Sequence, residues 1–141
     1  MPSAIHKVLL IDDSEIDNLI NQQVVQKDGF ADHIDVVTSG REALEHLRKA
    51  AGDGGKENLP EVILLDIRMP NMNGFEFLEA FESLPASVQE RCRIFMLSSS
   101  MHRDDVERAE KNPRIERFLS KPLSQSRMQE IRQHLEGLET G

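Results

Sequence analysis

The stretch that decides the fold is Glu-Val-Ile-Leu-Leu-Asp-Ile-Arg-Met-Pro-Asn-Met-Asn-Gly, residues 61–74. Its unbroken apolar run at residues 62–65 is typical of a strand buried on both faces, and the run delivers one carboxylate, Asp66, to its carboxyl end. Pro70 and Gly74 then turn the chain into a helix. An acid at the end of a strand is also consistent with a simple cap for the next helix, so the rest of the chain has to decide its role.

Five strands are expected along the chain, and several of them end in polar residues. The strands are expected at residues 8–11, 34–38, 62–65, 94–97 and 118–122. Asp12 and Asp13 follow the first strand, Ser98 follows the fourth, and the fifth delivers Lys121. Because parallel strands present their carboxyl ends at one edge of a sheet, these side chains are expected to face the same edge as Asp66.

Five helices are expected to alternate with these strands. One apolar face of the first helix consists of Ile16, Leu19, Ile20 and Val24, and this helix ends near Gly29, which can adopt the left-handed cap conformation. The others begin near Gly40, after Gly74, near residue 102 and at Ser124, the expected cap of the last helix. Apolar side chains that the last helix is expected to bury are Met128, Ile131, Leu135 and Leu138.

Two segments are not assigned to a helix or a strand. Residues 50–60 combine glycine with charge, which predicts a flexible loop rather than a linker between domains. Only a short amphipathic stretch follows Leu84 and Pro85. The alternation of strands and helices therefore predicts an α/β fold, a doubly wound five-stranded parallel sheet with helices on both faces.

Length and composition favour one domain and exclude several classes of function. A chain of 141 residues is long enough for one core, and we expect a single domain over residues 1–141. The net charge is −8, with no tryptophan, tyrosine or basic cluster, so we predict no direct binding of nucleic acid. The single Cys92, the lack of a signal sequence and the lack of a long apolar run predict a cytoplasmic protein without membrane insertion.

The polar residues at the strand ends suit phosphoryl chemistry. Three carboxylates in close contact repel one another, so they must hold protons or bind a cation, and an all-oxygen set favours Mg²⁺. Lys121 and Ser98 could bind phosphoryl oxygens, and one aspartate could attack phosphorus to form an acyl phosphate. Each residue alone has a simpler interpretation, as a helix cap, a loop hydroxyl or a solvated lysine. Their joint occurrence is what favours a phosphoryl site.

This set of residues resembles the receiver domain of bacterial two-component response regulators, of the stand-alone, chemotaxis-regulator-like type. The resemblance covers about residues 6–138 and rests on Asp12-Asp13, the pattern Asp66-x-x-x-Pro70-x-x-x-Gly74, Ser98, and Lys121-Pro122. It implies a flavodoxin-like fold, a cis peptide bond before Pro122, and a histidine kinase or phosphotransfer protein as phosphodonor. It also implies signalling by protein contact or onward transfer, through an unknown target, by a monomer or weak dimer.

The resemblance also implies a role for each residue of the site. Asp66 would accept the phosphoryl group, and Ser98 and Lys121 would bind its oxygens. The implied Mg²⁺ ligands are Asp12, directly or through water, Asp13, Asp66 and the backbone carbonyl of Arg68. The implied switch residues are Ser98 and Phe118. Serine replaces the commoner threonine, and phenylalanine replaces the commoner tyrosine, so only burial of the Phe118 ring could report the state.

Two other functions stay open from the sequence. A phosphatase of the haloacid dehalogenase type also uses an aspartate nucleophile and a lysine, but it requires Asp-x-Asp after the first strand, where this chain has Ser14. A binding module that does not depend on phosphorylation would have lost an acid, and all the acids are present. We therefore expect a phosphoacceptor that dephosphorylates itself and is not a turnover enzyme.

Overall fold

A computed structural model of the chain describes residues 5–54, 58–99 and 102–140, without the side chains of 53–54 and 138–140. Its centre is a parallel sheet with the strand order β2-β1-β3-β4-β5. The strands are β1 (Ile5–Ile11), β2 (Ala31–Val37), β3 (Val62–Asp66), β4 (Arg93–Ser98) and β5 (Ile115–Ser120). The helices are α1 (Glu15–Asp28), α2 (Gly40–Gly54), α3 (Gly74–Phe81), α4 (Ala86–Arg91), α5 (Arg103–Lys111) and α6 (Gln125–Thr140). The predicted fold class is confirmed.

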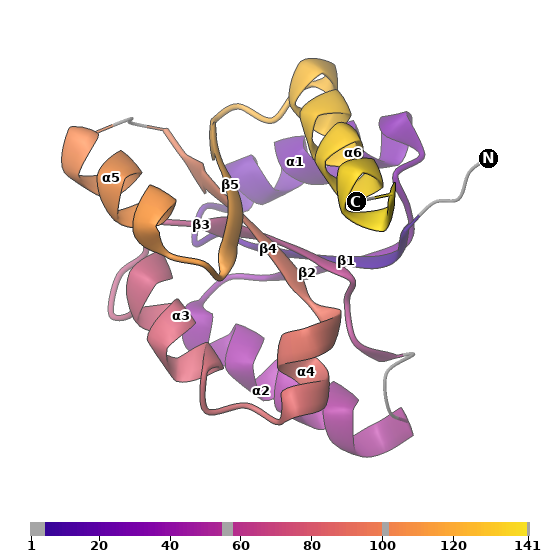
Figure 1. Cartoon of the computed structure of the whole chain (residues 1–141), viewed down its shortest axis with the longest axis vertical. Helices are drawn as coiled ribbons and strands as arrows, with labels where there is room; N and C mark the ends of the chain where they lie inside the picture. Colours follow the sequence, from indigo (N-terminus) through magenta and orange to yellow (C-terminus); the bar gives the residue numbers. More distant parts are fainter. Residues whose placement is uncertain (1–4, 55–57, 100–101, 141) are drawn as a thin grey trace.

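Helices cover both faces of the sheet, with α1 and α6 on one side and α2, α3 and α4 on the other (Figure 1). Alternate residues of the central strands supply the two cores, because successive side chains of a strand point to opposite faces. On the α2 and α3 face, the strand residues are Leu9, Ile11, Ile63, Leu65, Ile94 and Met96. On the α1 and α6 face, they are Val8, Leu10, Val62, Leu64, Phe95 and Leu97. The uninterrupted apolar runs therefore mark strands buried on both faces, as the sequence predicted.

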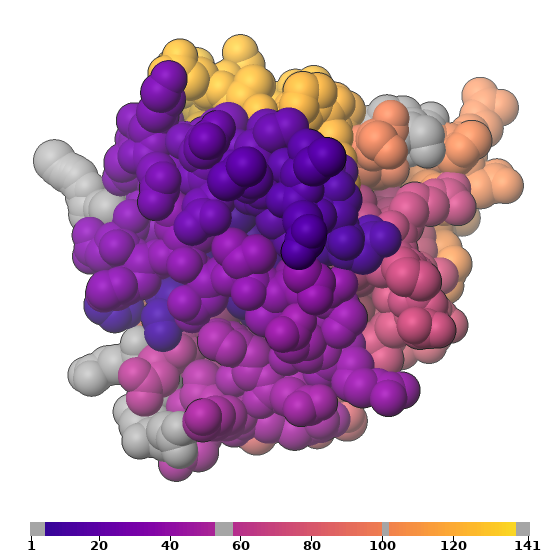
Figure 2. Space-filling view, turned by 180° about the vertical axis from the view of Figure 1, so that it is seen from behind, coloured from indigo at the N-terminus to yellow at the C-terminus, as the bar shows by residue number. Residues whose placement is uncertain are grey.

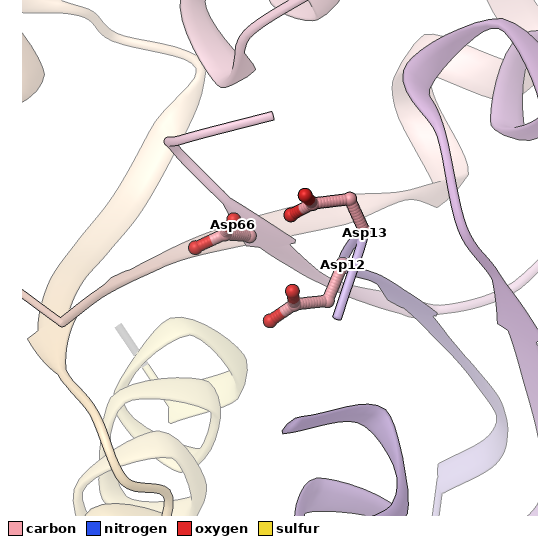
Figure 3. Close-up of side chains that lie close together, drawn as sticks. All are labelled: Asp12, Asp13 and Asp66. Carbon is pink, nitrogen blue, oxygen red and sulfur yellow. The ribbon is translucent and has the colours of Figure 1, made fainter. Parts of the chain in front are cut away.

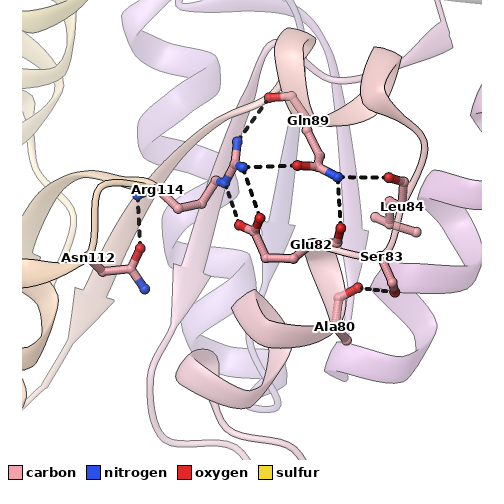
Figure 4. A network of polar contacts seen from close by, with 7 residues as sticks. All are labelled: Ala80, Glu82, Ser83, Leu84, Gln89, Asn112 and Arg114. Atoms are coloured by element: carbon pink, nitrogen blue, oxygen red, sulfur yellow. Dashed lines mark hydrogen bonds and ion pairs between the residues drawn. The ribbon is translucent and has the colours of Figure 1, made fainter.

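The part of the chain that the structure describes has six helices, so the expected five was one too few. The additional helix, α4, occupies the amphipathic stretch that follows Pro85. It is short and its N-terminal end has no side-chain cap. Arg114 holds it through Gln89, whose side-chain and backbone oxygens both accept hydrogen bonds from the guanidinium (Figure 4). A contact across 25 residues of sequence is not visible in a local pattern.

Several boundaries also differ from expectation. β2 begins three residues earlier than expected, at Ala31, and β5 ends at Ser120, so that Lys121 follows the strand instead of lying in it. α2 continues to Gly54 and thereby occupies part of the expected loop, of which residues 55–57 lie outside the described residues. Gly29 caps α1 at φ 69°, and the Ser124 hydroxyl accepts a hydrogen bond from the Arg127 N–H, as expected of a cap.

Three of the four residues of the predicted apolar face of α1 lie in solvent, whereas the fourth, Val24, packs partly buried against the core. The sheet-facing side of the helix is formed by Asn18, Asn21 and Val25, all buried. Ile16, Leu19 and Ile20 are 71%, 56% and 39% exposed. In the reverse view of the molecule, the amino-terminal part of the chain, in indigo and purple, forms much of the visible face (Figure 2). The sequence predicted that these residues share one face of the helix, but not that Ile16, Leu19 and Ile20 would stay exposed.

The buried face of the last helix agrees with expectation where it is described. Met128 and Ile131 are fully buried and Leu135 is partly buried against them, whereas the side chain of Leu138 lies outside the described residues. None of the helices in the described ranges combines the length and the apolar character needed to cross a bilayer.

Candidate functional site

Three carboxylates meet at the carboxyl edge of the sheet. β1 and β3 are neighbours with Ile11 opposite Leu65, so the residues after Ile11 come to lie beside Asp66 (Figure 3). One oxygen from each of Asp12, Asp13 and Asp66 lies within 4.8 Å of the others. Asp12 and Asp66 are buried and Asp13 is exposed. The strand order thus converts three separate sequence positions into one acidic cluster.

Lys121 brings a positive charge to this cluster from the loop after β5. Its Nζ lies 2.5 Å from Asp12 Oδ2, 2.9 Å from Asp66 Oδ1 and 3.0 Å from Asp17 Oδ2. The Lys121 backbone N–H donates to the carbonyl of Ser98 at 2.8 Å, which fixes this loop to the end of β4. The peptide bond between Lys121 and Pro122 is cis, as the resemblance implied.

Burial and neighbouring charges set the ionisation of both partners. Burial raises the pKa of Asp66 to about 6, and the Asp12 charge adds to this rise while the hydrogen bond from Lys121 opposes it. Burial lowers the pKa of Lys121, but hydrogen bonds to Asp12, Asp66 and Asp17 outweigh burial and raise that pKa above its usual value. The lysine is therefore a permanent cation, and Asp66 is an acid that favours a nearby positive charge.

The start of α1 positions Asp12. The N–H of Ser14 donates to Asp12 Oδ1 at 3.0 Å, and Asn18 Nδ2 donates to the Asp12 carbonyl at 2.7 Å. The Ser14 hydroxyl accepts from the N–H of Asp17 and so caps the helix. The helix that follows β1 is thus fastened to the carboxylate at the end of that strand.

The other residues selected from the sequence lie on β4, on β5 and in the loop after β3. Ser98 is fully buried at the end of β4, next to β3. The Arg68 side chain points to α5, where its Nη2 lies 2.6 Å from Asp105 Oδ2. Phe118 lies in β5 opposite Met96 and packs, partly buried, against the core on the α2 and α3 face. The described contacts of Phe118 do not reach the carboxylates.

Comparison with known proteins identifies the family. A family described as "Response regulator receiver domain" matches residues 8–133. The chain belongs to this family. Receiver domains are signalling modules that interact with histidine kinases or phosphotransfer proteins.

The most similar relatives of this receiver domain include regulators from archaea, plants and bacteria. The chain is 32% identical to the probable methanogenesis regulatory protein FilR2 of Methanothrix harundinacea, over 83% of this chain and 72% of that protein. It is 31% identical to the two-component response regulator ORR1 of rice over 89% of its length, but it spans only 53% of ORR1. A two-component response regulator from Cytophaga hutchinsonii has a similar structure, with a TM-score of 0.85 at 30% identity, covering 95% of this chain and 99% of that one.

Sequence reasoning missed two residues of this receiver domain that contact the site. Asp17 binds the ammonium of Lys121, and Asn18 supports the backbone of Asp12. The spacing of Ser14 and Asp17 is that of a helix cap, which explains why Asp17 drew no attention. Asn18 lies in a helical stretch whose apolar residues Ile16, Leu19 and Ile20 face solvent, whereas Asn18 itself is buried on the sheet-facing side. The position of a polar residue on that side of the helix was the one feature of the sequence that could have indicated its role.

Proposed function

We propose that this receiver domain accepts a phosphoryl group on Asp66 from the phosphohistidine of a sensor histidine kinase or phosphotransfer protein. The observation that carries the proposal is the meeting of Asp66 with two further acids and one lysine at the carboxyl edge of the sheet. A nucleophilic carboxylate, a cation site and a fixed ammonium are the parts that phosphoryl transfer requires.

The reaction exchanges one bond to phosphorus for another. A carboxylate oxygen of Asp66 attacks phosphorus and forms the acyl phosphate, while the bond from phosphorus to the donor imidazole nitrogen breaks and its electron pair stays on that nitrogen. The Lys121 ammonium, 2.9 Å from Asp66, is positioned to bind a phosphoryl oxygen, and Ser98 is proposed to donate its hydroxyl hydrogen to another. Water later hydrolyses the acyl phosphate, which returns Asp66 and releases phosphate.

Magnesium is the cofactor that these residues fit. The cluster offers only oxygen donors, and one of its members, Asp66, has a raised pKa because it is buried beside another acid. Asp12, Asp13, Asp66 and the backbone carbonyl of Arg68 are the proposed ligands. When bound, Mg²⁺ supplies positive charge that offsets the carboxylates and the incoming phosphoryl oxygens.

Phosphorylation would then act as a switch through Ser98 and Phe118. It adds about −1.5 to −2 charges at the end of β3 and gives Ser98 a new acceptor. We propose that the loop after β4 follows Ser98 and that the Phe118 ring, now partly buried, turns further inward. The surface that reads this change out to a protein target would comprise α5, β5 and α6.

The exposed face of α1 is the surface that we propose for docking the phosphodonor. It borders the site, because Asp17 in the first turn of α1 binds Lys121, and its Ile16 and Leu19 are more than half exposed. Changing Leu19→Gln is expected to lower phosphotransfer from any histidine kinase that labels the wild type about tenfold or more, without slowing labelling by acetyl phosphate. A loss with both donors, or with neither, would contradict this assignment.

The remaining features of the proposal follow the resemblance. We propose a stand-alone receiver that acts as a monomer or weak dimer in the cytoplasm, where histidine kinases draw phosphate from ATP. A haloacid dehalogenase type of phosphatase is not favoured, because the candidate nucleophile is on β3 and Ser14 interrupts the required Asp-x-Asp.

Intact mass after incubation with Mg²⁺ and acetyl phosphate tests the proposal. The wild type should gain one phosphoryl group that is labile to base and stable to acid, and Asp66→Asn should gain none. Asp104→Asn, at an exposed aspartate of α5, is the matched control and should label like the wild type. If no adduct forms, binding of beryllofluoride would show whether rapid hydrolysis hides it. Failure of both would leave a binding module that does not depend on phosphorylation.

A further inference from the structure

Asp17 contacts Lys121 at the site but has no role in the reaction proposed above. It occupies the third position of α1, where an acid usually completes a reciprocal cap. α3 shows that arrangement in full: the Asn73 side chain accepts from the Glu76 N–H, and the Glu76 carboxylate accepts from the Asn73 N–H, both at 2.9 Å.

In α1 the second half of this cap is made by a different residue. The N–H of Ser14 donates to Asp12 Oδ1 at 3.0 Å instead of to Asp17. The carboxylate of Asp17 is therefore left for another partner, and its Oδ2 accepts a hydrogen bond from Lys121 Nζ at 3.0 Å. Since the cap is already closed without it, this carboxylate is not required for the cap.

Lys121 has three N–H donors, and three carboxylates take them. Asp12 and Asp66 belong to the cluster that could hold a cation, and Asp66 is also the proposed nucleophile. During the proposed reaction both carboxylates therefore have to serve a cation or the phosphoryl group in addition to Lys121. Asp17 stands outside that cluster, so its contact is the one that can persist while the other two N–H groups turn to the phosphoryl oxygens.

We propose that Asp17 is a positioning residue for phosphoryl transfer, which keeps the Lys121 ammonium beside Asp66 while Asp12 and Asp66 change partners. The inference rests on the proposed function. The long side chain of Lys121 has many rotamers, so holding it in one of them costs conformational entropy. The contact with Asp17 on α1 fixes part of this side chain before the reaction, which reduces the entropy that must be lost to reach the transition state. The Asp17 side chain is 37% exposed, so water screens the pair and the effect is moderate.

The test compares rates of labelling by acetyl phosphate at saturating Mg²⁺. Asp17→Asn is expected to lower the rate constant at saturating phosphodonor about threefold to tenfold, because a hydrogen bond to a charged acceptor is weakened. Glu15→Gln is the matched control: it removes an acid from the same helix turn, where Glu15 is exposed and has no contact with Lys121, and should leave the rate within about twofold.

Repeating the measurement in a Lys121→Gln variant distinguishes a role of Asp17 in positioning Lys121 from a general effect of the substitution on the structure. In a Lys121→Gln protein, Asp17→Asn should cause no further loss, since the contact that it weakens no longer exists. An unchanged or faster rate for Asp17→Asn alone would overturn the inference, as would an equal loss in both backgrounds or with Glu15→Gln. If the wild type is labelled and Asp17→Asn is labelled at the same rate, the inference about Asp17 is wrong but the proposed function stands. A wild type that neither labels nor binds beryllofluoride would overturn both.

Discussion

At the scale of single residues, Asp66 is an acid whose surroundings oppose its charge in the metal-free protein. Burial raises its pKa from 3.8 to about 6. A difference of about two pKa units corresponds to about 3 kcal/mol by which ionised Asp66 destabilises the folded state. Ionised Asp66 therefore lowers the free energy of unfolding of the metal-free protein.

Replacing Asp66 with asparagine should remove this loss of folding free energy. In metal-free buffer at about pH 8, Asp66→Asn is expected to have a free energy of unfolding about 2 to 3 kcal/mol above that of the wild type. Because the folded pKa lies above the unfolded one, the folded wild type binds more protons between about pH 4 and pH 6, so acidification in this window stabilises it. Urea unfolding at several pH values measures the gap, which should close toward pH 4. A gap that is independent of pH would contradict the raised pKa.

Gly74 is a second residue whose identity the site requires. A Cβ there would lie 3.0 Å from the Asp66 carbonyl oxygen and 3.1 Å from the Ile67 Cα, both backbone atoms at the end of β3. At Gly40, by contrast, the closest atom is the Sδ of the flexible Met72 side chain, at 2.7 Å. Both glycines are buried at the first residue of a helix.

Alanine at these two glycines should therefore have different effects. Gly74→Ala is expected to lower the free energy of unfolding by about 1 to 3 kcal/mol, because the turn after β3 must move, and Gly40→Ala by less than about 1 kcal/mol. Chemical denaturation measures both. Equal losses would mean that the helix starts, and not the approach to Asp66, decide the cost.

The sequence could identify the residues of the site that lie at the carboxyl end of a strand. Asp66 is the last residue of β3, and Asp12 and Lys121 come directly after β1 and β5, so the parallel topology brings these positions together. Asp17 contacts Lys121 across 104 residues of sequence, and its local pattern suggests only a helix cap. Asp17 could pair with the Ser14 N–H in the cap or with Lys121, and only the three-dimensional structure shows that it pairs with Lys121.

At the scale of elements, the same limit applies to α4. The buried strands and the periodic helices could be predicted because their patterns are local. α4 has six residues and no side-chain cap, so its own sequence gives it little stability. What holds it is a polar network at the opposite edge of the sheet from the acids, where Arg114 contacts Glu82 and Gln89 (Figure 4). Helix prediction from local pattern fails where a distant residue supplies the contacts.

The Arg114 network should therefore matter for stability and not for chemistry. The guanidinium contacts both carboxylate oxygens of Glu82, at 3.0 and 3.3 Å, and its Nη2 lies 3.0 Å from Gln89 Oε1. Arg114→Met is expected to lower the free energy of unfolding by about 1 to 3 kcal/mol, because these partners lose a charged donor. Labelling by acetyl phosphate at a temperature where the variant is folded should not change.

Arg117→Met is the matched control for this prediction. Arg117 is 46% exposed and pairs with Glu130 at 3.3 Å, so its loss should cost less than about 0.5 kcal/mol. Thermal or urea unfolding of both variants gives the comparison. If Arg117→Met were as damaging as Arg114→Met, the network would be no more than an ordinary surface ion pair.

At the scale of the whole molecule, the net charge of −8 and the acidic cluster both predict that cations stabilise the fold. The two effects differ in whether they depend on the kind of cation. General screening depends on ionic strength, whereas a site that binds only the folded state adds about 1.4 kcal/mol of stability at about ten times the dissociation constant of its ligand. For a domain of this size that corresponds to a rise in melting temperature of about 3 to 6 °C.

Magnesium should therefore raise the melting temperature of the wild type by more than NaCl at equal ionic strength does. Asp13→Asn removes one candidate ligand that is exposed and contributes little to packing, and it should abolish most of the additional rise. Asp104→Asn removes the same charge from α5 and should keep the full response, because it lies outside the cluster. Differential scanning fluorimetry of the three proteins decides between the two explanations. If NaCl matched the effect of MgCl₂, or if both variants lost the response equally, charge screening of an acidic chain would account for the stabilisation, and the proposed metal site would be wrong.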